Sequence, residues 1–180
     1  MSEIPRFPLM GAFGDRVEIS AVTIDELSDV RALERSSFAH LNAALTTEAE
    51  LDAFNAWVVS SEHAEALFEY VMHDALYGAR LDGRLIGVVG WGCMNGQNDT
   101  VRLHLLFVDH LFAKNGVGRR LLRHFEQRAQ LAGAEVLSVK TLMSSVGFFE
   151  ADGHLVTSYG SHALSTDQSL RIAFLRKELG

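Results

Sequence analysis

Two glycines one residue apart, Gly116 and Gly118, stand between an apolar segment and a helical pattern. A helix N-terminus carries partial positive charge and usually attracts Asp or Glu in its first turn. Here the charged side chains between Gly118 and Glu126 are basic instead, namely Arg119, Arg120 and Arg123. The pattern indicates an anion site, in which backbone N–H groups that the glycines leave unshielded bind a phosphate-like group. A tight turn followed by solvated arginines is the alternative.

A second candidate for chemistry lies on the apolar segment before this turn. Arg102 and His104 are two residues apart, so in a strand their side chains point to the same face. A histidine that titrates near neutrality can accept a proton from an attacking group. A guanidinium cannot act as a base, but it can bind a carboxylate. A histidine that is hydrogen-bonded inside a sheet is the competing interpretation of His104.

These residues belong to a predicted strand–turn–helix unit. The strand is the apolar segment that ends at Val108. The helix carries one apolar stripe with a spacing of three to four, formed by Val117, Leu121, Leu122, Phe125, Ala129 and Ala132. The dinucleotide fingerprint is absent because Leu121 replaces its third glycine. The P-loop is absent because no Lys-Ser or Lys-Thr pair follows the glycines.

The segment 106–118, LFVDHLFAKNGVG, resembles the central signature of the GNAT superfamily of acetyl-CoA-dependent N-acyltransferases. That signature is a strand, then Gln/Arg-x-x-Gly-x-Gly/Ala, then a helix. Ala113 departs from it, because Gln or Arg is usual there. The resemblance implies that amides of the loop bind the CoA pyrophosphate and that the strand pairs with the pantetheine arm. The implied cofactor-binding residues are Leu106, Phe107, Val108, Lys114, Asn115, Gly116, Val117, Gly118 and Arg119.

The same resemblance implies catalytic roles. The backbone amide of Leu106 would polarise the thioester carbonyl, and His104 stands where the aralkylamine-acetylating branch has a histidine of a water-mediated proton relay. Phe149 occupies the position of the usual tyrosine acid and has no proton to give. By residue type alone, the substitutes for this acid are Tyr70, Tyr77 and Tyr159.

Composition limits the class of protein. A chain of 180 residues with 48% hydrophobic content predicts one domain over residues 16–180, preceded by a tail over residues 1–15. No run of 18 apolar residues occurs, so we expect no membrane span. The single Cys93 is typical of a reducing cytoplasm, where we expect the protein to reside. A formal net charge of −7 argues against nucleic-acid binding.

Patterning along the chain predicts an α/β fold. Capping boxes at Thr23–Glu26 and Thr47–Glu50 begin two helices, and Ser61 begins a third. Asp82-Gly83 predicts a hairpin. Strands are predicted at 17–21, 76–81, 84–94, 100–108, 135–142, 154–164 and 169–175, with further helices from the glycine pair to Gly133 and at 144–151. The GNAT resemblance then implies a mixed central sheet of about seven strands, helices on both faces, and splayed fourth and fifth strands.

The prediction is therefore an N-acetyltransferase that moves the acetyl group of acetyl-CoA directly to a primary amine of a small molecule or of an amino-acid-like or peptide compound. The resemblance implies that an acidic helical block over residues 24–74 forms part of the acceptor site, and a solvated face is the alternative for its acids. No metal-ligand spacing is visible, so no metal is expected. A CoA-binding regulatory or structural module and a binder of another nucleotide stay open as alternatives. A homodimer is also an open alternative.

Overall fold

The computed structural model describes residues 16–94 and 97–180, and the side chains of residues 93–98 are not described. The predicted tail over 1–15 and the predicted Asn95-Gly96 turn therefore lie outside the described residues. The elements are β1 (Val17–Ala21), α1 (Leu27–Leu41), α2 (Glu48–Val58), α3 (Ser61–Met72), β2 (Leu76–Leu81), β3 (Arg84–Met94), β4 (Gln97–Val108), α4 (Val117–Leu131), β5 (Val136–Leu142), α5 (Val146–Glu150), β6 (Leu155–Ala163) and β7 (Ser169–Glu178).

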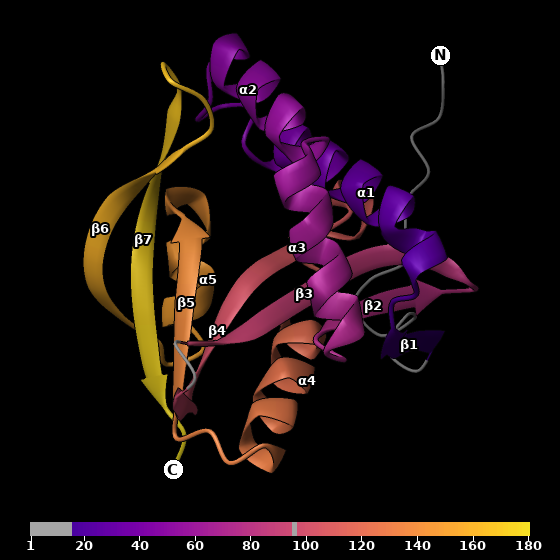
Figure 1. Ribbon diagram of the computed structural model, residues 1–180, viewed down its shortest axis with the longest axis vertical. Coiled ribbons are helices and arrows are strands. Elements are labelled where there is room, and N and C mark those ends of the chain that lie inside the picture. The colour runs from indigo at the N-terminus through magenta and orange to yellow at the C-terminus, as the bar shows by residue number, and fades with distance from the viewer. Residues whose placement is uncertain (1–15, 95–96) are drawn as a thin grey trace.

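The strands form one seven-stranded sheet in the order β1-β2-β3-β4-β5-β7-β6. All neighbouring pairs are antiparallel except β4 and β5, which run parallel. Figure 1 shows the sheet as two wings that meet where β4 and β5 cross, with β5, β7 and β6 in one wing and β1 to β4 in the other. This confirms the predicted mixed sheet. Among the described residues, no helix is both long and apolar enough to span a membrane.

Local sequence signals account for most element boundaries. Both predicted capping boxes form, at Thr23–Glu26 and at Thr47–Glu50. The first begins a 3-10 turn at Ile24–Glu26 before α1, so the α-helix starts three residues later than the box suggests. Asp82 and Gly83 both adopt positive φ, as a tight hairpin with the right-handed strand twist requires. Gly133 ends α4 with φ +83°.

Helices cover both faces of the sheet. The amphipathic α4 packs on one face through Leu121, Leu122 and Phe125, all fully buried. Leu33 of α1 and Leu67 of α3 pack on the opposite face. Figure 1 shows α4 on one side of the strands and α1 to α3 on the other. Gly87 permits this packing, because a Cβ there would lie 2.9 Å from Cδ1 of Leu121.

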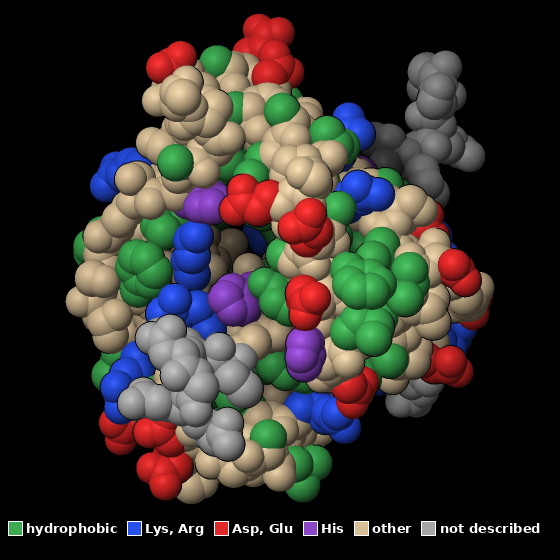
Figure 2. All heavy atoms as spheres, in the orientation of Figure 1, with side chains coloured by type: hydrophobic (Ala, Val, Ile, Leu, Met, Phe, Trp, Pro, Cys, Tyr) green, Lys and Arg blue, Asp and Glu red, His purple; other side chains and the backbone are tan. Residues whose placement is uncertain are grey.

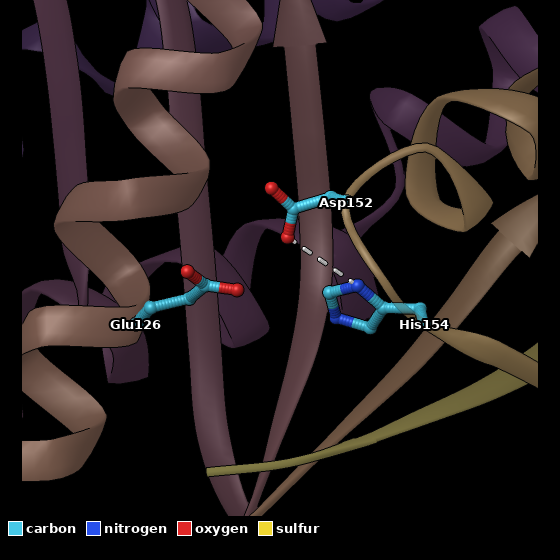
Figure 3. Close-up of side chains that lie close together, drawn as sticks. All are labelled: Glu126, Asp152 and His154. Carbon is cyan, nitrogen blue, oxygen red and sulfur yellow. Dashed lines mark ion pairs between the residues drawn. The ribbon is translucent and has the colours of Figure 1, made fainter. Parts of the chain in front are cut away.

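An ion-pair cluster ties α4 to the β7 wing. Lys177 Nζ of β7 donates to Oε1 of Glu126 on α4 at 2.7 Å and to Oδ2 of Asp152 at 2.8 Å. The ring of His154, which is 1% exposed, lies against Asp152 with 3.6 Å between Nδ1 and Oδ2 (Figure 3). Two carboxylates and a histidine this close could hold a metal ion. Here the Lys177 ammonium supplies the positive charge between the carboxylates, so we interpret the cluster as structural.

The pKa values in the cluster follow from this arrangement. Burial alone would raise the pKa of Asp152, but hydrogen bonds from Lys177 and Glu126 and the Lys177 charge outweigh it and lower the pKa. Burial and the neighbouring Asp152 raise the pKa of Glu126. Burial would lower the pKa of Lys177, and its two acidic partners raise it instead. The Asp152 contribution to stability is therefore present above its unfolded pKa and is lost as the pH falls.

We predict that Lys177→Met lowers the free energy of unfolding by about 1 to 3 kcal/mol at pH 7, between the values for exposed and buried pairs. The substitution leaves Asp152 and Glu126 without a cation, so the loss should shrink as the pH falls and these carboxylates protonate. Urea unfolding at pH 7 and pH 4.5 measures both effects. Arg176→Met is the matched control, because Arg176 forms an exposed pair with Glu178 at 53% and 81% side-chain exposure. Equal losses for the two variants would contradict a structural role for the cluster.

Candidate functional site

The turn before α4 is held open by two residues with positive φ. Gly116 is the N-cap of α4 with φ +81°, and Lys114 has φ +61°. A Cβ at Gly116 would meet no atom within 4 Å, so the glycine is required by backbone conformation and not by crowding. A Cβ at Gly118 would lie 3.5 Å from the ring of Phe148, an ordinary contact. Gly118 therefore lies in ordinary contact distance of Phe148 and Val108 and contributes no side chain of its own.

Backbone N–H groups gather at this turn without acceptors. In the described part of the chain, no hydrogen bond is donated by the amides of Lys114, Gly116, Val117, Gly118 or Arg119. The amide of Asn115 differs, because it donates to the Phe112 carbonyl at 3.4 Å. No acidic side chain lies in the first turn of α4. Unpaired donors at the positive end of a helix make this turn suited to an anion.

The arginines that the sequence places near this turn divide into two groups. Arg120 donates from NH2 to the carbonyl of Val17 at 2.8 Å, so its guanidinium is engaged with β1. Arg119 and Arg123 are exposed. Fewer arginine side chains are therefore available to the anion site than the sequence suggests.

The parallel pairing of β4 with β5 stops halfway along the strands. The paired residues run from Thr100 with Val136 to Leu103 with Val139, and none follow. Beyond Leu103, no strand of the described residues lies beside this edge of β4, up to Val108. The predicted splay of the fourth and fifth strands is confirmed. The half-buried residues 106–108 lie on this open edge and lead to the turn before α4.

His104 lies at the point where the two strands part. Gly90 pairs with Leu105 and Trp91 with Leu103, so His104 is the extra residue of a β-bulge. A Cβ at Gly92 would lie 3.3 Å from the Nε2 of His104, which explains why glycine is needed beside it. The Tyr70 ring stacks on the His104 ring with 5.5 Å between centroids. The residue lies in the sheet and is exposed on one side.

The charge state of His104 differs from the prediction. Desolvation by surrounding protein atoms and the positive charges of Arg102 and Lys140 lower its pKa from 6.5 to about 4. Desolvation is the largest of these causes, and the two cations act in the same direction. The expected titration near neutrality is therefore wrong. His104 is a neutral imidazole at physiological pH and can accept a hydrogen bond.

The three tyrosines proposed as acids lie in different places. Phe149 is 2% exposed and packs edge-on against His154, so the usual tyrosine position is core. Tyr77 donates to Asp74 at 2.6 Å on the α4 side, and Tyr159 is exposed on β6. Only Tyr70 of the three contacts His104. Burial and the Glu34 charge raise the pKa of Tyr70, so its hydroxyl keeps its proton near neutrality.

A ring of contacting side chains surrounds His104. The sequence did not single out these residues. Lys140 Nζ lies 3.0 Å from Nδ1 of His162, and His162 meets the Trp57 ring edge-on at 5.4 Å between centroids. Trp57 in turn packs at 4.2 Å on His63. Figure 2 shows a hollow in this face, with Lys or Arg and histidine side chains on one side and Asp or Glu side chains on another.

The ring closes through a buried acid–histidine pair. Nε2 of His63 lies 2.8 Å from Oε2 of Glu34, and both side chains are at most 5% exposed. Oε1 of Glu34 has no hydrogen-bond partner among the described residues. The negative charge of Glu34 raises the pKa of Tyr70, and the aromatic ring of Tyr70 stacks on His104, which completes the circle of contacts. Trp57 is half-buried, packing on a core cluster and on His162 of β6. Helical spacing could not reveal a contact with β6.

A separate surface cavity of about 420 Å³ lies between α1 and the β2–β3 turn. Its polar lining includes Asp29, Ser36, Arg84 and Asp109, and Arg84 already pairs with Asp109 at 2.6 Å. None of the candidate site residues named above lines it. This cavity is therefore distinct from the hollow beside His104.

Comparison with known proteins agrees with this architecture. The family model described as an acetyltransferase (GNAT) domain matches residues 42–161. No curated protein matches the chain. Among solved structures, a GCN5-related N-acetyltransferase from Rhodopseudomonas palustris is 19% identical with a TM-score of 0.74, covering 90% of this chain and 95% of its own.

Two further structures share the fold. The PaiA N-acetyltransferase of Thermoplasma acidophilum, solved in complex with coenzyme A, is 20% identical with a TM-score of 0.72, covering 91% of this chain and 99% of its own. A protein described as a phosphinothricin N-acetyltransferase is 18% identical with a TM-score of 0.70, again with 91% and 99% coverage. The family match spans well over half of the chain, and the splayed sheet with its open turn before α4 is present. The chain belongs to the GNAT family of acetyltransferases.

Proposed function

We propose that the protein transfers the acetyl group of acetyl-CoA directly to a primary amine of a small molecule. The observation that carries this proposal is the set of unpaired amides at residues 114 and 116–119, which leads along the open edge of β4 to His104. These amides would bind the diphosphate of acetyl-CoA. The open edge of β4 would hydrogen-bond the pantetheine arm as an added strand does. The loop residue Asn115 contributes less through its amide, which is already engaged.

Bound acetyl-CoA would supply the thioester at the point where the strands part. The backbone amide of Leu106, on the open stretch of β4, is our candidate to stabilise the negative charge that develops on the carbonyl oxygen. His104 would accept the proton that the acceptor nitrogen loses as its bond to the acetyl carbon forms. The Tyr70 hydroxyl, beside His104, would donate a proton to the sulfur as the carbon–sulfur bond breaks.

The charges around His104 bear on the acceptor. An amine attacks only through its free lone pair, so it must be deprotonated. Arg102 and Lys140, which lower the pKa of His104, would lower the pKa of an amine bound beside it for the same reason. The site would thus favour the reactive neutral amine without needing a strong base. A histidine with a pKa of about 4 is suited to pass the proton onward and not to store it.

The alternative is a CoA-binding module with little catalysis. It is favoured by Phe149, which leaves the usual acid position without a proton donor. Acetyl-CoA binding without release of free thiol from any amine would establish this alternative. Stabilisation by another nucleotide, with none by CoA, would contradict both proposals.

We predict that Gly118→Leu weakens acetyl-CoA binding by about tenfold or more, because its side chain would cover the amides before α4. Calorimetry measures the affinity. Gly118→Ala is the control, since its Cβ makes only an ordinary contact with Phe148. Melting temperatures of both variants should stay close to that of the wild type. Unchanged affinity in Gly118→Leu would remove this turn from the CoA site.

We predict that His104→Gln lowers kcat/KM by about a hundredfold, the range of a lost general base. Since the pKa of His104 is about 4, the loss should be the same at every pH between 6 and 9. The remaining rise of rate with pH should follow the ionisation of the acceptor amine. A loss that disappears below pH 7 would show instead that His104 titrates near neutrality.

We predict that Tyr70→Phe lowers kcat about tenfold with little change in the KM for acetyl-CoA, because it removes a proton donor and keeps the aromatic stack. Tyr159→Phe, on exposed β6, is the matched control and should leave kcat unaltered. If the two variants behave alike in steady-state assays, Tyr70 is not the acid.

A further inference from the structure

Two basic side chains face the hollow from the strands that part. Lys140 on β5 follows Val139, the last residue paired with β4, just as His104 follows Leu103. Arg102 is paired with Ser138, one step earlier in the same register. Alternation along the strands puts Arg102 and Lys140 on the face that carries His104. Two positive charges thus flank the place where the acceptor amine would react.

Neither charge has an acidic partner. Lys140 contacts His162 at 3.0 Å, and Arg102 donates to Oγ of Ser138 at 3.3 Å and lies 5.9 Å from the centre of the Phe174 ring. In residues 16–94 and 97–180, excluding the side chains at 93–98, no carboxylate forms an ion pair with either residue. The half-buried Arg80, Arg128 and Lys177, by contrast, each pair with an acid of the fold.

Without an acidic partner, these two half-buried charges destabilise the protein when no ligand is bound. Both side chains are half-buried, and burial together with Arg102 lowers the pKa of Lys140. His162 offers Lys140 no negative charge, and burial together with the Lys140 charge lowers the pKa of this histidine, which favours a neutral ring that can accept a hydrogen bond from Lys140. Charges that leave water are normally paired. An anion in the hollow would supply the missing partner.

The CoA phosphates are poorly placed to be that anion. The amides that would bind them begin at residue 114, beyond the end of β4 at Val108. Val108 itself is four residues from His104, about 13 Å along an extended strand. The anion must therefore come from another molecule in the hollow. The aromatic rings of Trp57 and Tyr70 on the rim suit an organic molecule better than a simple ion.

We propose that the acceptor is an amine that also carries an acid group, a carboxylate or a phosphoryl group, which Lys140 and Arg102 bind while the amine lies at His104. This inference rests on the proposed function and names its substrate class. Lys140 and His104 stand at corresponding positions of neighbouring strands, whose spacing is about 5 Å before they part. The acid group and the amine are therefore separated by a short linker, as in α-, β- and γ-amino acids or aminoalkylphosphonates. Polyamines are disfavoured by repulsion from the same two cations.

The test compares amino acids with their carboxamides, which keep the amine and lose the negative charge. Affinity for the complex of the protein with CoA is measured by calorimetry, and acetyl transfer is measured separately by release of free thiol. We expect the acids, or the matching aminoalkylphosphonates, to bind and react at least about tenfold better than the amides. The comparison between carboxylates and phosphonates identifies which acid group the site prefers.

Lys140→Met should reduce this preference about tenfold or more, and Lys140→Arg should restore most of it. Arg16→Gln is the charge-matched control, because exposed Arg16 precedes β1 at the opposite edge of the sheet and pairs with Asp82. It should leave the preference intact. A melting temperature for each variant separates loss of the site from loss of the fold.

The outcomes separate the two proposals. If acids bind in a Lys140-dependent way but no amine is acetylated, the acid site stands and the transferase proposal fails. If carboxamides bind and react as well as the acids, the transferase proposal stands and the acid site is overturned. Absence of binding by every acid in the panel also overturns the acid site.

Discussion

The end of hydrogen bonding between β4 and β5 after Leu103 and Val139 is the constraint on which the site depends. An extra residue in β4, His104, falls at this point, and a bulge bends and twists the strand that contains it. Among the described residues, the outer part of β4 keeps β3 on one side and has no strand on the side toward β5, and this open edge leads to the turn before α4. Backbone donors and acceptors along this edge are therefore left unpaired. In a strand inside a sheet, a neighbouring strand would normally hydrogen-bond them.

The same point collects the charges that decide the chemistry. Desolvation together with the charges of Arg102 and Lys140 keeps His104 neutral, and the same surroundings would favour the neutral form of an attacking amine. The chain has a formal net charge of −7, so two half-buried cations without acidic partners are a local exception. No acid among the described residues forms an ion pair with either cation, and the buried Glu34 contacts His63 instead. The site is therefore positive at the reaction point, although the protein as a whole is negative.

Much of the fold could be predicted from local patterns. Capping boxes, the Asp82-Gly83 turn and the glycine pair at 116 and 118 act within a few residues, so they placed helices and strands close to their observed bounds. The unpaired amides before α4 follow from the same local signal. Contacts between distant segments could not be found this way. The Glu126–Asp152–His154 cluster joins α4 to the segment before β6, and no spacing in the sequence brings those residues together.

The sequence by itself determined the strand–turn–helix unit, the open turn at Gly116 and Gly118, and the presence of His104 beside Arg102 on one strand face, because each depends on neighbours along the chain. Tertiary structure alone decided the insertion of β7 between β5 and β6, the ring from Trp57 through His162 and Lys140 to His104, and the pKa of that histidine. A pKa and a missing counter-charge depend on burial and on the distance between side chains, and both are set only when segments far apart in sequence pack against one another.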